Sequence, residues 1–275
     1  MTALDLVLDW HVDNVAATVI DRAGTTLATT GLVERTFPLA SVTKLLTAYT
    51  TLIAVEEGSI DLDTPHTIDE AGAVTVRQLL SHSSGMAPLQ RLRLSPPQAR
   101  RIYSNAAFDV VAEIVATATG IDFATYAAEA VFEPLGMTRT ALPGPAGSGA
   151  VSTVVDLARF ATELFAPRLV AVETLHEATT TQFPGLSGVL PAFGRQDPND
   201  WGLGFELRHR KSPHWTGTTN SPDTFGHFGR SGTFLWVDPV AGLAMVCLTD
   251  REFGDWAAAS WPQVSDAVIA EFALR

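Results

Sequence analysis

Cysteine is the rarest reactive residue in this chain of 275 residues, and its scarcity excludes one kind of stabilisation. The single cysteine, Cys247, has no partner for an internal disulfide. It lies in the apolar run 244–248 with no basic neighbour, which predicts a buried and unreactive thiol. Charged residues make up only 17% of the sequence, against about 25% in an average soluble protein, so we expect a compact fold with a large core.

Positive charge is also scarce, and this argues against a nucleic-acid partner. The formal net charge is −12, whereas phosphate binding requires clustered lysine and arginine. The one basic cluster, formed by Arg208, Arg210 and Lys211, is expected to be a solvated surface. The histidines show no metal-ligand spacing, so neither a metal nor a cofactor is expected.

Long apolar runs and an export signal are missing as well. Residues 1–15 carry three aspartates and no basic segment, which is unlike a signal peptide. No apolar stretch reaches the roughly 18 residues that a membrane helix needs. These absences favour a cytoplasmic protein without a membrane partner, and they leave its oligomeric state open.

The order of predicted elements favours the α/β (α+β) class. Strand-like segments occur near both ends of the chain, and the middle has helical periodicity with glycine or proline at helix ends. We therefore expect a single domain over 1–275. Its antiparallel sheet would come from residues 1–60 and 200–275, flanked by terminal helices, and residues 61–199 would form an inserted, mainly helical lobe. The glycine- and proline-rich stretch 183–199 is expected to border a cleft.

The first motif with chemical meaning is Ser41-Val42-Thr43-Lys44, at the start of an apolar helix. Residues three apart on a helix are neighbours, so Lys44 would lie beside Ser41. A lysine kept neutral by burial can take the proton of a serine nucleophile. The alternative is structural: Ser41 caps the helix and Lys44 extends to solvent. The chain has only two lysines, and one of them faces an apolar helix side, which favours the chemical interpretation.

Two further segments contain candidate site residues. Tyr103-Ser104-Asn105 precedes a long helix, and the structural alternative to a role in the site is a helix cap. The segment 227–232 reads His-Phe-Gly-Arg-Ser-Gly ahead of a strand, where glycines permit close approach of a ligand to the backbone. Its alternative is a glycine turn with a surface histidine.

Together, Ser41-x-x-Lys44, Tyr103-x-Asn105 and His227-x-Gly229 resemble the three active-site motifs of the serine β-lactamase and penicillin-binding-protein superfamily. The most similar branch contains class C β-lactamases, D-alanyl-D-alanine carboxypeptidases and related esterases. Residues outside the three motifs, such as Leu-Leu-Ser-His-Ser-Ser-Gly-Met at 79–86, support the resemblance, which spans roughly Val15 to the C-terminus.

The resemblance implies a serine hydrolase that forms an acyl-enzyme with a small-molecule ester or amide. Ser41 would be the nucleophile, and Lys44 and Tyr103 would move its proton, with the choice of acylation base left open. Asn105 would bind a substrate amide or orient Lys44.

The third motif would form the opposite wall of the site. The resemblance implies that His227 and Gly229 contact the substrate, and that the backbone N–H groups of Ser41 and Arg230 form an oxyanion hole. His227 replaces the lysine of class C β-lactamases, which weakens the expectation of strong β-lactam hydrolysis. His82 is expected to be a structural loop residue.

Two rival interpretations remain to be weighed. One is a catalytically silent scaffold that binds a peptide or metabolite in the same cleft, although the intact motifs argue against it. The other is an α/β-hydrolase esterase, but the required Gly-x-Ser-x-Gly segment does not occur in this sequence.

Overall fold

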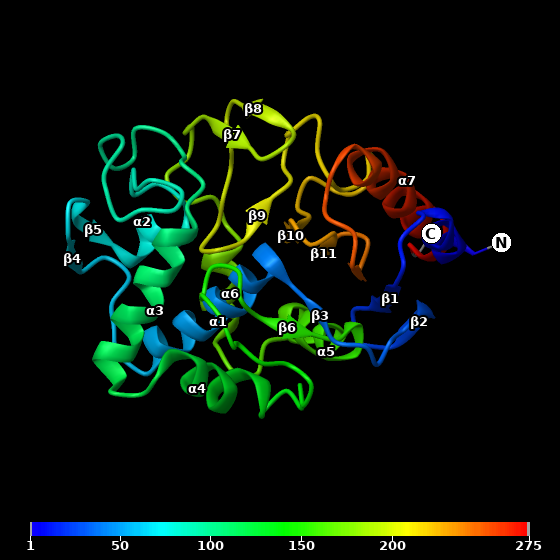
Figure 1. The fold of residues 1–275 in the computed structure, drawn as a ribbon, viewed down its shortest axis with the longest axis horizontal. Helices are drawn as coiled ribbons and strands as arrows, with labels where there is room; N and C mark the ends of the chain where they lie inside the picture. The colour runs from blue at the N-terminus through cyan, green and yellow to red at the C-terminus, as the bar shows by residue number, and fades with distance from the viewer. Residues whose placement is uncertain (1, 274–275) are drawn as a thin grey trace.

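The computed structural model describes residues 2–273, and a six-stranded antiparallel sheet forms its centre (Figure 1). The strand order is β2-β1-β12-β11-β10-β9, so both ends of the chain contribute, as the sequence predicts. The strands of this sheet are β1 (Val15–Asp21), β2 (Thr26–Gly31), β9 (Glu206–Leu207), β10 (Phe225–Gly229), β11 (Thr233–Asp238) and β12 (Leu243–Thr249). The predicted α/β class with an antiparallel sheet is confirmed.

The chain between β2 and β9 contains most of the helices. They are α1 (Thr43–Glu56), α2 (Val76–Leu80), α3 (Asn105–Thr119), α4 (Phe123–Ala127), the π-helix η3 (Ala128–Phe132), α5 (Val154–Phe165) and α6 (Val172–Ala178). A 3₁₀ helix, η1 (Ala3–Asp9), opens the chain, and α7 (Asp255–Phe272) closes it. The apolar pattern of residues 256–274 predicts that this last helix reaches Leu274, which lies outside the described residues.

The central strands are buried on both faces, and alternate side chains enter two different cores. On β12, Ala244, Val246 and Leu248 belong to the core that contains α1 and α5. Met245 and Cys247 belong to the core beneath η1 and α7. This period of two is what a pleated strand between two helical layers requires. It also confirms that Cys247 is buried, and burial raises the pKa of its thiol.

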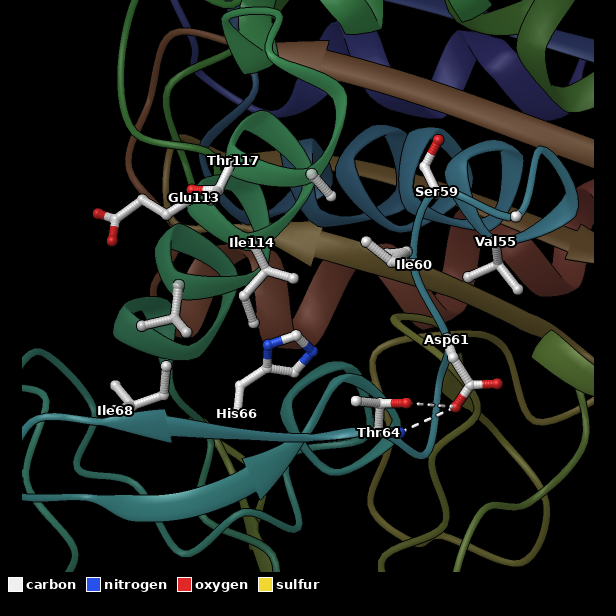
Figure 2. Close-up of a pocket in the computed structure, with 13 residues that line it drawn as sticks. Val55, Ser59, Ile60, Asp61, Thr64, His66, Ile68, Glu113, Ile114 and Thr117 are labelled. Atoms are coloured by element: carbon white, nitrogen blue, oxygen red, sulfur yellow. Dashed lines mark hydrogen bonds between the residues drawn. The ribbon is translucent and has the colours of Figure 1, made fainter.

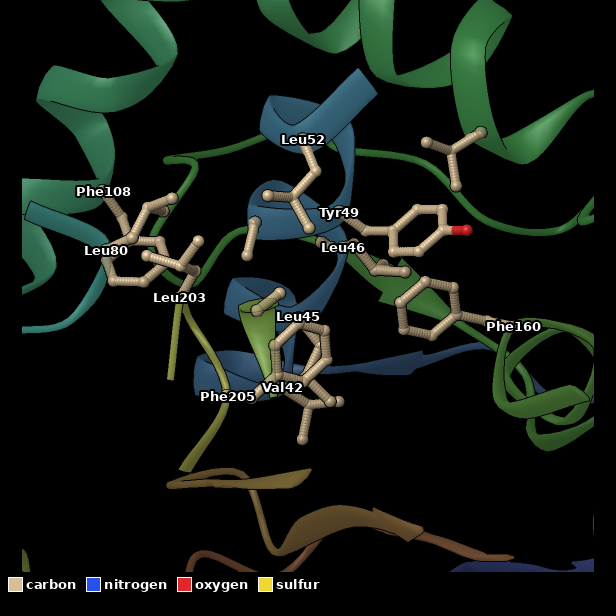
Figure 3. Close-up of a cluster of buried hydrophobic side chains, with 14 of the residues drawn as sticks. Val42, Leu45, Leu46, Tyr49, Leu52, Leu80, Phe108, Phe160, Leu203 and Phe205 are labelled. Atoms are coloured by element: carbon tan, nitrogen blue, oxygen red, sulfur yellow. The ribbon is translucent and has the colours of Figure 1, made fainter. Parts of the chain in front are cut away.

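Helix α1 runs through the middle of the molecule, and nearly all of its side chains are buried. Figure 3 shows Leu45 and Tyr49 of α1 packed among side chains from other elements, including Phe108 of α3 and Phe160 of α5. A helix that is apolar on all sides is stable only inside a protein core. Residues carried at its start are therefore fixed in position by the surrounding core.

Several short elements were not expected from the sequence. The apolar residues of 202–208 predict a strand over that whole segment, but only β9 forms there. The glycine-rich stretch 183–199 contains the hairpin of β7 (Gly188–Leu190) and β8 (Gly194–Gln196). Two further pairs are β4 (Pro65–Ile68) with β5 (Gly72–Thr75), and β3 (Phe37–Pro38) with β6 (Val151–Ser152). Such two- to four-residue pairs are too short for a recognisable hydrophobic alternation.

The two ends of the chain lie side by side over the sheet, as Figure 1 shows for η1 and α7. The backbone N–H of Ala3 donates a hydrogen bond of 2.5 Å to the Glu271 carboxylate, and the rings of Trp10 and Trp256 meet edge to face. None of the helices in residues 2–273 is long and apolar enough to cross a membrane.

Candidate active site

Ser41 lies in the short 3₁₀ helix η2 (Ala40–Val42), directly before α1. The preceding Ala40 has a φ of 46°, a left-handed conformation that is costly for a residue with a Cβ. Hydrogen bonds from the turn between β10 and β11 and from the start of β11 hold this turn in place. The Ser231 hydroxyl donates to the carbonyl of Pro38 at 2.7 Å, and the Thr233 hydroxyl donates to that of Leu39 at 2.9 Å.

Lys44 extends from the first turn of α1 and is completely buried. Its Nζ donates hydrogen bonds to Asn105 Oδ1 at 2.5 Å and to the carbonyl of Gly147 at 2.7 Å. Nζ also lies 3.4 Å from Ser41 Oγ and 4.7 Å from the centre of the Tyr103 ring. The structure thus brings residues of the first two motifs into one contact cluster.

The loop that carries Gly147 is tied to α1 by two threonines. The Thr47 hydroxyl donates to the carbonyl of Ala146 at 2.6 Å, and the N–H of Ala150 donates to Thr43 Oγ1 at 3.0 Å. A Cβ on Gly147 would lie 3.0 Å from the carbonyl oxygen of Asn105, so glycine permits this close approach. This second acceptor for Lys44 was not identified from the sequence.

Burial lowers the pKa of Lys44 from its ordinary 10.5 to about 7, and the nearby Asp109 carboxylate opposes this shift in part. A charged ammonium without a carboxylate in direct contact is poorly stabilised in the protein interior. A large fraction of the amine is therefore neutral near neutral pH.

Tyr103 is held from two sides. Ser104 caps α3, because its side chain accepts a hydrogen bond from the N–H of Ala107, and its own N–H donates to Nδ1 of His82 at 3.2 Å. The His82 ring packs on the Tyr103 ring with centroids 4.6 Å apart. His82 is buried and its ring supports the backbone and ring of this segment, which agrees with its expected structural role.

Desolvation raises the pKa of Tyr103 above its usual range, and a hydrogen bond with Ser41 opposes this rise. Tyr103 is therefore a neutral phenol at physiological pH. Its hydroxyl lies 3.5 Å from Nε2 of His227.

His227 lies ahead of the strand β11, as the sequence predicts, and is itself part of the neighbouring strand β10. Its Nδ1 is 2.7 Å from the carbonyl oxygen of Phe228, and because that oxygen only accepts, Nδ1 carries the proton. Burial, with a smaller contribution from the charge of Lys44, lowers the pKa of His227 to about 3. The ring is thus neutral, and Nε2 faces Tyr103 as an acceptor.

Ser41, Tyr103, Asn105, His227 and Arg230 all line one cavity of about 310 Å³. Its other walls are mainly apolar and come from Leu190, Pro191, Ala192, Trp201, Phe228 and Phe253, so the stretch 183–199 does border a cleft. Lys44 lies behind Ser41 and is not among the lining residues.

Gly229 does not line this cavity, although the sequence placed it with the substrate-contacting residues. A Cβ at this position would lie 2.3 Å from the carbonyl oxygen of Leu39 and 2.5 Å from Thr233 Oγ1. Its small size therefore lets β10 approach the turn that carries Ser41.

The sequence interpretation missed a buried polar cluster at the cavity wall. Glu206 on β9 lines the cavity and is 1% exposed. Lys211 and His214 each approach Glu206 Oε1 at 3.0 Å, and Trp215 Nε1 donates to Oε2 at 2.8 Å. The expectation that Lys211 is a solvated surface residue is wrong, because its charge is paired with this carboxylate in the interior. Only the exposed Arg210 of that basic cluster fits the expectation.

A second cavity, of about 740 Å³, lies between the end of α1, helix α3 and strand β4 (Figure 2). Figure 2 shows His66 of β4 facing Ile114 of α3, with Asp61 engaged in hydrogen bonds to Thr64. It is larger than the cavity at Ser41, but Lys44, Tyr103 and His227 are not among its lining residues. Within residues 2–273, no group of three or more His, Cys, Asp or Glu side chains could hold a metal ion.

Comparison with solved structures includes a relative of high identity. A β-lactamase from Mycobacterium bovis is 55% identical, with 99% of this chain and 100% of the relative covered and a TM-score of 0.96. None of the curated proteins compared matches the chain.

Two more distant structures have the same fold. One is simvastatin synthase from Aspergillus terreus, which is 18% identical, with a TM-score of 0.81 over 98% of this chain and 97% of that one. The other is an octameric penicillin-binding protein homologue from Pyrococcus abyssi. The latter is also 18% identical, with TM-score 0.77 over 97% of this chain and 75% of its own. At such identities only the fold is shown.

The family described as beta-lactamase matches residues 10–268, which is most of the chain. This match agrees with the three motifs and with the fold. The protein therefore belongs to the β-lactamase family.

Proposed function

We propose that the protein is a serine hydrolase that acts on a small ester or amide through an acyl-enzyme. Ser41 is the nucleophile, Lys44 takes its proton, and Tyr103 passes a proton to the leaving group. The proposal draws support from the family and from the surroundings of Ser41. Which of three activities the protein has, esterase, D-amino-acid peptidase or weak β-lactamase, depends on which substrates the residues lining the cavity accept.

The environment of Lys44 Nζ carries this proposal. A neutral amine has two N–H bonds and one lone pair. Two carbonyl oxygens, of Asn105 and Gly147, accept the two N–H bonds, and the remaining neighbour is Ser41 Oγ at 3.4 Å. The lone pair is therefore directed to the serine hydroxyl, as a general base requires.

Between the two candidate bases, the electrostatics favour Lys44. Its pKa of about 7 leaves much of it neutral, whereas the raised pKa of Tyr103 keeps the phenol protonated. In the acylation step, Ser41 Oγ bonds to the substrate carbonyl carbon and its proton moves to Lys44. The tetrahedral intermediate then expels the leaving group, which takes a proton from the phenol of Tyr103. The proton on Lys44 restores the phenol, and water hydrolyses the acyl ester.

The negative charge on the carbonyl oxygen needs hydrogen-bond donors. Within the described chain, neither the N–H of Ser41 nor that of Arg230 donates to a backbone or side-chain acceptor. Both residues line the cavity, so these N–H groups are available as an oxyanion hole.

Reaction with a fluorophosphonate probe tests the proposal against the silent-scaffold alternative. We expect one covalent adduct, on Ser41, found by mass spectrometry of the intact protein and of its peptides. Prior exposure to a slowly hydrolysed ester should block the reaction. An unlabelled but folded protein would favour the scaffold.

We expect Tyr103→Phe to lower kcat by about 10²-fold, which is within the usual range for a general acid–base group. The phenyl ring can retain its packing on His82, so the thermal unfolding temperature should change little. Steady-state kinetics with p-nitrophenyl and alkyl esters provides the measurement. The loss should be larger for the alkyl ester, because its leaving group requires a proton. Equal rates for variant and parent would remove Tyr103 from the mechanism.

A further inference from the structure

Glu206 is the charged side chain placed most deeply in the wall of the Ser41 cavity. It pairs across the sheet with Gly226, the neighbour of His227, and its side chain is shielded from solvent. Three donors fix the carboxylate: Lys211 and His214 on one oxygen and Trp215 on the other.

This carboxylate is ionised, and it belongs to a residue of the cavity wall. Burial alone would raise the pKa of Glu206, but Lys211 and His214 hold it well below its usual range. Glu206 lines the cavity, whereas Lys211 and His214 do not. The side chain of Glu206 is fully buried, so the negative end of the ion pair lies just behind the cavity surface, nearer to a bound substrate than the positive end.

The other walls offer little to balance that charge. His227 is neutral, and six of the remaining lining residues are apolar. Arg230 is the one cationic residue among those lining the cavity, but its side chain is 80% exposed and lies 3.5 Å from Glu252. The exposed Arg230 guanidinium is screened by water, whereas the buried pair of Glu206 and Lys211 is screened much less.

We propose that Glu206 is a specificity-determining residue, which makes the cavity accept neutral, apolar acyl groups and reject those that carry a carboxylate. The inference rests on the proposed hydrolase function. A substrate carboxylate would lose its hydration in an apolar cavity and would meet a fixed anion there. β-Lactams that carry a carboxylate are rejected on the same ground.

The unaltered protein provides the first test. We compare p-nitrophenyl hexanoate with the mono-p-nitrophenyl ester of adipic acid, which has the same number of acyl carbons and ends in a carboxylate. At pH 7.5, kcat/KM for the hexanoate should exceed that for the adipate ester by about 10²-fold, because like charges brought together at a binding site cost several kcal/mol. Similar values for both esters would overturn the inference and leave the hydrolase intact. Absence of turnover and of fluorophosphonate labelling would instead overturn the proposed function.

The variant Glu206→Gln tests the residue itself. It retains the shape of the side chain and leaves Lys211 as the nearest charge, so the preference for hexanoate should fall at least tenfold, mainly through faster turnover of the adipate ester. Glu113→Gln is the matched control, because Glu113 is exposed in the second cavity and lies outside the Ser41 site. That control should retain the full preference.

Should Glu206→Gln fail to fold, the double variant Glu206→Gln/Lys211→Met removes both charges, a replacement that buried ion pairs often tolerate. It should also lose most of the preference for hexanoate. A folded single or double variant that retains the full preference would show that Glu206 does not determine specificity.

Discussion

Replacement of Ser41 by alanine is expected to abolish ester hydrolysis, with a loss of about 10⁴-fold or more in kcat. Losses on this order follow when the nucleophile of a serine hydrolase is removed, and the residual rate comes from binding and the oxyanion hole. The hydroxyl makes only peripheral hydrogen bonds, with Lys44 at 3.4 Å and with Tyr103, so the folded state should lose little. Activity assays on p-nitrophenyl esters and thermal unfolding provide the two measurements.

A matched control separates this effect from serine loss in general. Ser59→Ala alters an exposed serine in the second cavity, away from Lys44 and Tyr103, and should retain full activity. A Ser41→Ala protein that still turns over esters would refute the assignment of the nucleophile. A variant that is inactive because it has unfolded would be identified by its lowered unfolding temperature.

Part of the proposed catalytic arrangement could be predicted from sequence because it depends on local rules. Ser41 and Lys44 are neighbours through helix geometry alone. Tyr103 and Asn105 flank a serine that caps a helix, so their placement follows from a local signal. The third segment was recognised by its resemblance to a family, since nothing local to 227–232 indicates that β10 lies against the turn of Ser41.

Other parts of the site depend on contacts that leave no pattern in the sequence. Gly147 accepts from Lys44 only because two threonines of α1 tie its loop in place. Lys211 is close to two arginines in the sequence, and such a basic segment predicts a solvated surface. The structure instead buries Lys211 against Glu206. A buried ion pair is set by tertiary packing, and no spacing rule along the chain specifies it.

The two lysines of the sequence differ in the groups that contact their amines, and this difference fits their different proposed roles. Both are buried. Burial lowers the pKa of Lys211 as well, but the Glu206 carboxylate in direct contact opposes that shift. Lys44 faces two carbonyls and a hydroxyl, so nothing in direct contact compensates for burial and the amine can shed its proton.

Replacement of Lys44 by methionine should therefore lower kcat/KM by about 10³-fold, and the pH dependence should identify the cause. In the parent protein, kcat/KM should rise with pH through a midpoint near 7, because only the neutral amine accepts the serine proton. The residual activity of Lys44→Met should not show this midpoint, and its fluorophosphonate labelling should be slow at every pH. A parent profile without a transition near 7, or a variant that retains the transition, would contradict the assignment of Lys44 as the base.

Stability should follow pH in the same direction, because the pKa of Lys44 is about 7 in the folded protein and 10.5 as its ordinary value. Between these values the unfolded chain binds a proton that the folded protein lacks, so the free energy of unfolding should rise with pH across this window. Below pH 7 Lys44 is protonated in both states, so the folded protein bears the full free-energy cost of burying the charged ammonium. The difference in unfolding free energy between the parent and Lys44→Met should therefore shift in favour of the parent from pH 7 to 10. A constant difference would mean that the amine keeps its charge in the folded state and cannot be the base.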